Sequence, residues 1–259
     1  MIFRTTLEAA FEYRGTLVIW FLAELVSIVT WLFLWSAVYR EQFLVGNYEF
    51  YQIVLYFLLI PVVGALTSIN LSDNLPFEIK DGGISKDLLK PYSITILNYV
   101  KPIAYKISQQ FFKLPIFLAL LLFAFYIFKI DFNLNNFILG LIFCVFAYTL
   151  HFFLDICISY AAFWMDDVWA LSHLKTVCLI VFGGMSFPLD LVNPVFRPIF
   201  DFLPFRFFYF VPIQIIQGLL SYRQIILEFL ILMTWVLILF LFSKVLLKTG
   251  LRKYGAYGN

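Results

Sequence analysis

Six long apolar runs, each with at most two charged residues, make up about half of this sequence. They cover residues 15–38, 51–69, 107–128, 137–162, 169–187 and 225–247. Each is close to the roughly 20 residues that a helix needs to cross about 30 Å of hydrocarbon. Lipid offers the backbone no hydrogen-bond partner, and these runs lack the alternation of a barrel strand, so we expect helices. The sequence therefore predicts an all-α polytopic membrane protein, with six transmembrane helices in one domain over residues 1–259.

Composition excludes the soluble alternatives. Hydrophobic residues make up 63% of the chain and charged residues 13%, whereas a soluble domain typically has about 45–50% and about 25%. Intrinsic disorder is excluded as well, because it requires low hydrophobicity. The net charge of +2 is too small to indicate a nucleic-acid partner. The lipid bilayer is the partner that this composition predicts.

Lysine and arginine residues are unevenly divided between the two sides of the predicted bilayer. With six spans both termini lie on one side, and that side carries Arg4, Arg14, Lys80, Lys86, Lys90, Lys101, Lys106, Lys175, Lys244, Lys248, Arg252 and Lys253. The other side carries Arg40, Lys129, Arg197, Arg206 and Arg223. Because cytoplasmic loops carry the basic excess, we expect a multi-pass protein of the inner or plasma membrane with both termini in the cytoplasm.

Three further segments are not spans. Residues 1–14 are amphipathic and predict a helix in the membrane interface, with a frayed tail as the alternative. Residues 70–106 form a polar cytoplasmic segment, where Ser85 is predicted to cap a short helix whose apolar face carries Ile84, Leu88 and Leu89. That helix is either a docking element for a cytoplasmic partner or a solvated loop helix.

The third segment, residues 188–212, lies on the external side and is interrupted by prolines. They are Pro188, Pro194, Pro198, Pro204 and Pro212. Proline stops regular helix, yet the many phenylalanines between these prolines would not face water. Broken helix at membrane depth is tolerated where it is buried in protein. We therefore predict short re-entrant helices, with additional spans as the alternative.

Ionisable residues inside spans are the candidates for chemistry. Glu24 lies in the first span, and His151 and Asp155 lie four residues apart on one face of the fourth. The pair is either a proton relay or cation site, or an internal hydrogen bond that fixes helix packing. None of the 12 glycines is followed by lysine, so the phosphate-binding G-x-x-x-x-G-K-[ST] loop is absent. We expect no enzymatic activity, no metal and no cofactor on this chain.

Three local patterns, in this order, resemble the membrane subunits of type-2 ATP-binding-cassette (ABC) exporters. The first is residues 81–91, DGGISKDLLKP, which are similar to a G-x-[IL]-x-x-x-L-L-x-P segment after the second span. The second is AFW at 162–164 followed by GGMSFPL at 183–189, LPF at 203–205 and Pro212. The third is GLRKYGAYG at 250–258. The resemblance is to a six-span branch with multidrug and viologen-type exporters.

This resemblance implies roles for particular residues. A coupling helix would dock on separate ABC ATPase subunits, which bind the ATP and magnesium, through Glu78, Ile84, Asp87, Leu88, Leu89 and Pro91. An external cap would include Pro188, Pro204, Phe205 and Pro212. A second permease chain, the same or homologous, would complete the pathway.

The substrate class follows from composition and from Glu24. The 33 phenylalanines suit a hydrophobic or amphiphilic compound, and Glu24 in the seam between two chains would favour a cation. Two other functions stay open: a proton-coupled secondary carrier that uses His151 and Asp155, and a membrane scaffold that transports nothing. A carrier of this kind often shows internal repeats, which the span pattern lacks.

Overall fold

The computed structural model describes residues 14–41, 44–89, 91, 93–129 and 133–253, and this part of the chain is mostly helical. Its one pairing of extended backbone is an isolated bridge between Val45 and Tyr48. The prediction of an all-α membrane protein is confirmed. The interfacial helix predicted for residues 1–14 lies outside the described residues, except for Arg14.

Each of the six apolar runs lies on a helix, although the fifth run, predicted over 169–187, is helical only as far as Phe182. The helices are α2 (Arg14–Val38), α3 (Phe50–Thr67), α6 (Ile94–Phe128), α7 (Leu134–Tyr160), α8 (Trp169–Phe182) and α11 (Tyr222–Lys253). Among the described residues, α2, α3, α7 and α11 are long and apolar enough to cross a membrane. Helix α8 has 14 residues, which at about 1.5 Å per residue span about 21 Å of a core of about 30 Å. That α6 and α8 also cross the bilayer stays a prediction.

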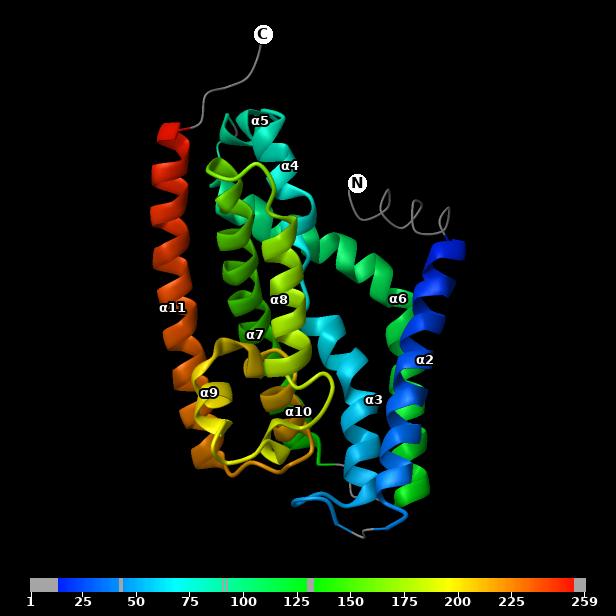
Figure 1. Ribbon diagram of the computed structural model, residues 1–259. Coiled ribbons are helices and arrows are strands. Elements are labelled where there is room, and N and C mark those ends of the chain that lie inside the picture. The colour runs from blue at the N-terminus through cyan, green and yellow to red at the C-terminus, as the bar shows by residue number, and fades with distance from the viewer. Residues whose placement is uncertain (1–13, 42–43, 90, 92, 130–132, 254–259) are drawn as a thin grey trace.

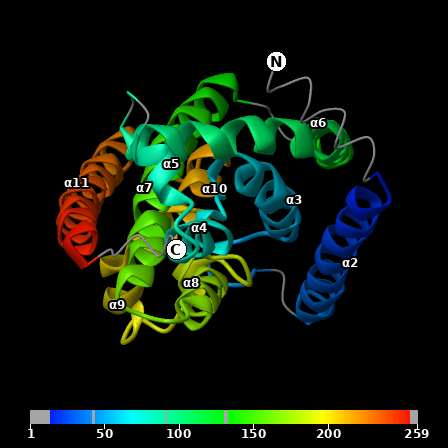
Figure 2. The ribbon, with the colours of Figure 1, turned by 90° about the horizontal axis from the view of Figure 1, so that it is seen from above.

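Helix α6 begins earlier than the sequence predicts. The segment 70–106 is expected to be a cytoplasmic connection, but its last part, from Ile94 onward, is helical. Ile94 and Asn98 are both buried, as two positions on one helical face should be. Helix α6 crosses the bundle and then turns to lie beside α2 (Figures 1 and 2). It contains Pro102 and Pro115, and proline is a common cause of such a change of direction.

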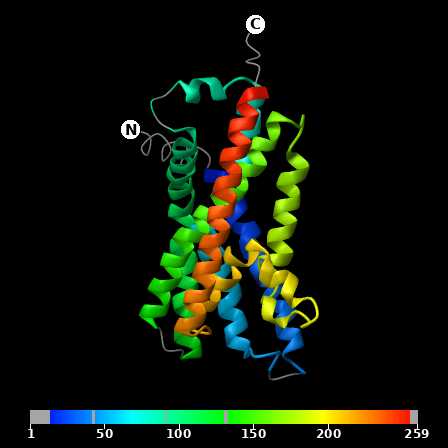
Figure 3. The same ribbon diagram turned by 90° about the vertical axis from the view of Figure 1, so that its left-hand side faces the viewer.

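Short helices close both ends of the bundle (Figures 1 and 3). One end, called here the α4–α5 end, carries η1 (Leu71–Asp73), α4 (Leu75–Lys80), α5 (Ile84–Leu88) and η2 (Ala161–Phe163). The opposite end, the α9–α10 end, carries η3 (Leu189–Leu191), α9 (Arg197–Phe202), η4 (Pro204–Phe207) and α10 (Phe210–Ile216). The second group covers the segment predicted to be re-entrant, and every residue of α10 is buried.

Two clusters of buried apolar side chains hold the helices together. The larger joins α3, α7 and α10, and at its edge Trp31 of α2 stacks on Phe57 of α3 with 5.6 Å between ring centroids. The smaller lies at the α4–α5 end and includes Ile79, Ile84 and Phe152. At this end η1, α4 and η2 therefore pack onto α7, and α5 packs against α6.

Gly140 lets α7 and α10 approach each other closely. A Cβ atom there would overlap the side chain of Ile216 and lie 3.5 Å from the carbonyl oxygen of Pro212. Replacing Gly140 by leucine should therefore lower the free energy of unfolding by about 1–3 kcal/mol, the usual cost of overpacking. Thermal denaturation of the purified protein in detergent measures this loss. Ala119→Leu is the control because Ala119 is exposed on α6, and an equal loss in both variants would contradict the prediction.

Candidate functional site

The carboxylate of Asp155, on α7, binds the chain where α3 has ended and η1 begins. The backbone N–H groups of Leu71 and Ser72 donate to its Oδ2 atom at 2.5 and 3.0 Å, and the Ser72 hydroxyl donates to Oδ1 at 3.1 Å. Asp155 is completely buried. Because an ionised carboxylate forms strong hydrogen bonds with N–H donors, this side chain fixes the start of the segment that leads into α4 and α5.

Lys175, on α8, supplies the opposite charge. Its ammonium group donates to Oδ1 of Asp155 and to the Ser72 hydroxyl, and Ser172 lies 3.0 Å from that hydroxyl. The side chains of Lys175 and Asp155 are 5% and 0% exposed. We call Ser72, Asp155, Ser172 and Lys175 the buried ion-pair cluster. It joins η1, α7 and α8 at one point.

The predicted hydrogen bond between His151 and Asp155 is wrong. Both side chains are buried and both face the end of α3, as their spacing implies, but they bind different atoms. The Nδ1 atom of His151 lies 3.1 Å from the carbonyl oxygen of Thr67, and the ring packs on Phe208. His151 and Asp155 each bind groups on α3, η1 or α8 that are distant in the sequence, and they do not bind each other.

Sequence reasoning missed the role of Lys175, which it counted only among the basic residues of the cytoplasmic side. A signal was present, because Ser172, Lys175 and Leu179 recur at helical spacing and all three are buried in α8. A lysine on the same face as a serine and a leucine, inside an apolar run, indicates a buried cation that needs an acidic partner. Asp155 was the acidic residue available in the neighbouring span.

The α4–α5 segment carries the residues predicted to dock on an ATPase. Ile84 is fully buried, Asp87 is 6% exposed and Leu89 is 88% exposed. The prediction that Leu89 shares a face with Ile84 is therefore wrong. Leu89 still has helical backbone angles, but it lies five residues after Ile84, about 140° around a helix of 3.6 residues per turn. The predicted cap is wrong too, since Gly83 precedes the helix and Ser85 lies within it.

The remaining docking candidates lie around this segment. Glu78 on α4 and Pro91 beyond α5 are exposed. Asp87 forms an ion pair of 2.8 Å with Lys101 of α6, so it holds α5 against the bundle. The side chain of Leu88 lies outside the described part of the structure. Leu89, Glu78 and Pro91 are thus the candidates with side chains open to a partner.

Glu24 forms an ion pair between two long helices. Its carboxylate lies 3.0 Å from the ammonium group of Lys113 on α6, and both side chains line a polar cavity of about 650 Å³. Glu24 keeps 42% of its side chain exposed. It can therefore meet a cation from that cavity only in competition with Lys113.

At the α9–α10 end, polar contacts brace the predicted cap. The Tyr48 hydroxyl donates to Asp190 at 2.9 Å and accepts from the Gln214 amide. Burial, and then the Asp190 charge, raise the pKa of Tyr48 far above its usual value, and burial also raises the pKa of Asp190. The loop between α2 and α3 is thereby attached to η3 and α10.

The cap residues predicted at this end differ in burial. Pro188, Pro204 and Pro212 are buried, and Phe205 is half-buried. Pro188 precedes η3, Pro204 begins η4 and Pro212 lies inside α10. In the described residues no group of three His, Cys, Asp or Glu side chains is placed to hold a metal ion.

Comparison with known proteins identifies the family. A family model described as an ABC-2 family transporter protein matches residues 25–258. Searches of curated proteins and of solved structures gave no match. The matched range contains the buried ion-pair cluster, the α4–α5 segment and the short helices of the opposite end. Because the match covers nearly the whole sequence, the chain belongs to the ABC-2 family of transporter proteins.

Proposed function

We propose that this chain is the permease subunit of an ABC exporter. It pairs with a second permease chain, the same or homologous, and separate ATPase subunits drive the transport of a hydrophobic or amphiphilic compound. The membership of the ABC-2 family supports a membrane component of an ABC transporter. In this proposal the α4–α5 end faces the cytoplasm, as the distribution of lysine and arginine indicates.

The observation that carries this proposal is the buried ion-pair cluster. Force applied to α4 and α5 by a partner reaches η1 directly, because η1 ends two residues before α4 begins. At η1 the cluster passes the force to α7 and α8 through hydrogen bonds that are shielded from water. Charged hydrogen bonds in such a place are short and strong. A push at the α4–α5 end therefore moves long helices and not only a loop.

The same cluster disfavours the proton-coupled carrier. Asp155 is fully buried, pairs with Lys175 and accepts two backbone hydrogen bonds. These contacts, with those from the Ser72 hydroxyl and Lys175, engage both oxygens of the carboxylate inside the protein. A carrier needs a group that gains and loses its proton during each cycle. The Nδ1 atom of His151 lies 3.1 Å from the carbonyl oxygen of Thr67, and among the described residues His151 forms no hydrogen bond with Asp155, which speaks against a relay between them.

Leu89 gives the direct test of docking. Because its side chain is 88% exposed, Leu89→Asp should leave the fold unchanged while it places a charge on an apolar contact. We expect an ATPase to co-purify with the unaltered chain from native membranes, and at least about tenfold less with Leu89→Asp, a change of about 1.4 kcal/mol in binding.

Leu89→Met is the matched control, since it keeps an apolar side chain of similar size, and it should retain the ATPase. An unchanged melting temperature for both variants separates docking from folding. If the unaltered protein co-purifies with no ATPase and moves substrate in liposomes under a proton gradient, the permease proposal is wrong. If Leu89→Asp retains the ATPase, the docking site lies elsewhere and the coupling argument fails.

A further inference from the structure

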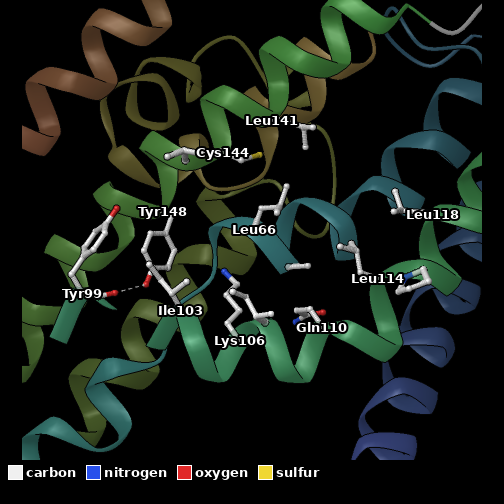
Figure 4. Close-up of a pocket in the computed structure, with 14 residues that line it drawn as sticks. Leu66, Tyr99, Ile103, Lys106, Gln110, Leu114, Leu118, Leu141, Cys144 and Tyr148 are labelled. Atoms are coloured by element: carbon white, nitrogen blue, oxygen red, sulfur yellow. Dashed lines mark hydrogen bonds between the residues drawn. The ribbon is translucent and has the colours of Figure 1, made fainter. Parts of the chain in front are cut away.

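An apolar cavity opens on the side of the bundle between α3, α6 and α7 (Figure 4). Its volume is about 720 Å³, within the range of about 300–1,000 Å³ that is usual for small-molecule sites. Leu66, Leu114 and Cys144 line it. Ile107 and Val145 also line it and are 49% and 61% exposed. These exposed residues lie inside predicted spans, so the opening faces lipid.

Lys106 lies at the polar end of this cavity. Its ammonium group donates to the carbonyl oxygen of Ser68 at 2.6 Å and lies 5.1 Å from the centroid of the Tyr148 ring. In Figure 4 its side chain points from α6 toward Leu66. Within the part of the chain that the structure describes, no carboxylate lies within ion-pair distance of Lys106. The contacts with a carbonyl and a ring leave its charge uncompensated.

Two neighbouring lysines differ from Lys106 because they have acidic partners. Lys101, Lys106 and Lys113 all line the polar cavity that also contains Glu24. Lys101 is paired with Asp87 and Lys113 with Glu24. An enclosed ammonium group without an acidic partner costs free energy, and an anionic ligand would offset that cost.

The two cavities adjoin at Lys106 and Gln110. Lys106 and Gln110 line both of them, one cavity apolar and open to lipid and the other polar. A ligand that fits both has a polar head and a hydrocarbon tail, and an anionic head would compensate the Lys106 ammonium group. Tyr148 and Leu141 are seven residues apart on α7, so the tail has about 10 Å of helix to follow at about 1.5 Å per residue.

We propose that these adjoining cavities bind an anionic lipid of the surrounding bilayer, with its head group on Lys106 and one acyl chain in the apolar cavity. The site lies on the flank formed by α3, α6 and α7, and it requires neither an ATPase nor a transported compound. Such a lipid stabilises the folded protein in proportion to its occupancy.

Photo-crosslinking tests this site. The probe is phosphatidylglycerol with a diazirine on one acyl chain, incorporated with the full chain into nanodiscs, and mass spectrometry locates the labelled residues. We expect labelling within residues 103–118 and 141–148. Phosphatidylcholine with the same labelled chain should give at least about fivefold less, because its head group has no net charge.

Variants distinguish the effect of the Lys106 charge on lipid labelling from the effect of the cavity's shape. Lys106→Met should lower phosphatidylglycerol labelling at least about fivefold, and Lys106→Arg should retain it. Lys248→Met is the control and should leave it unchanged, because Lys248 is exposed on α11 and lines neither cavity. Ala65→Leu should lower labelling by both lipids, since Ala65 lines the apolar cavity.

Two results would overturn the proposal: equal labelling by the two lipids in the unaltered protein, or full labelling in a folded Lys106→Met variant. If Lys106→Met fails to fold, Ala65→Leu and the comparison of the two lipids still decide. The test involves no ATPase, so its outcome is independent of the Leu89 experiment.

Discussion

Replacing Lys175 by methionine is expected to lower the free energy of unfolding by about 3–5 kcal/mol, the usual cost of leaving a buried charge without its partner. Methionine is nearly as long as lysine, so the substitution leaves little empty space, and the loss reflects the missing charge. The Asp155 carboxylate, completely buried, would keep its hydrogen bonds from η1 but lose its counter-charge. The loss is measured from thermal denaturation in detergent and from the yield of folded protein.

The matched control is Lys248→Met, because Lys248 is exposed on α11. It should change stability by less than about 0.5 kcal/mol, as surface substitutions usually do. The double variant Asp155→Asn with Lys175→Met should recover part of the loss, since neither partner is then a buried charge. If Lys175→Met is as stable as Lys248→Met, the buried ion-pair cluster does not hold η1 in place.

The second large effect is expected at the α9–α10 end, where Arg206→Met should cost about 3 kcal/mol for the same reason. The Arg206 guanidinium is 8% exposed and lies 2.7 Å from Glu228 of α11 and 3.2 Å from Asp201. Its removal leaves Glu228, which is 19% exposed, without a positive partner. Urea or thermal unfolding of the purified protein measures the change.

Arg197→Met provides a control that shares the same aspartate. Arg197 is 48% exposed and lies 3.5 Å from Asp201, and an exposed pair of this kind contributes about 0–1 kcal/mol. Arg206→Lys should fall between the two, because lysine restores the charge without the planar fork of arginine. If Arg197→Met and Arg206→Met lower the free energy of unfolding equally, burial does not decide how much each ion pair contributes to stability.

The long helices were predictable because their cause is local. A run of about 20 apolar residues has one stable form in lipid, so α2, α3, α7 and α11 follow from composition alone. The early start of α6 was not predictable in the same way, because residues from Ile94 to Lys106 are mixed in polarity. Their helix is supported by burial of Ile94 and Asn98 against the bundle, which requires the fold to be known.

The partners of charged residues were harder to predict than the helices. The spacing of His151 and Asp155 correctly placed both on one face, but a helical wheel shows only neighbours on the same helix. The true partners, Thr67 and Lys175, lie 84 and 20 residues away along the chain. Leu89 is exposed because it lies five residues after Ile84, about 140° away around the helix.

The pairing of Asp155 with Lys175 also bears on how the protein enters the membrane during synthesis. A lone charge costs about 2.5–3.5 kcal/mol on insertion scales at a helix centre, and less for Asp155, which lies toward one end of α7. The two residues are only 20 positions apart, on consecutive helices, so the ribosome delivers the second soon after the first. We expect α7 and α8 to leave the insertion channel together, as a helical hairpin in which these two charges neutralise each other. The η1 segment precedes both helices in the sequence, so it is already synthesised when they pair.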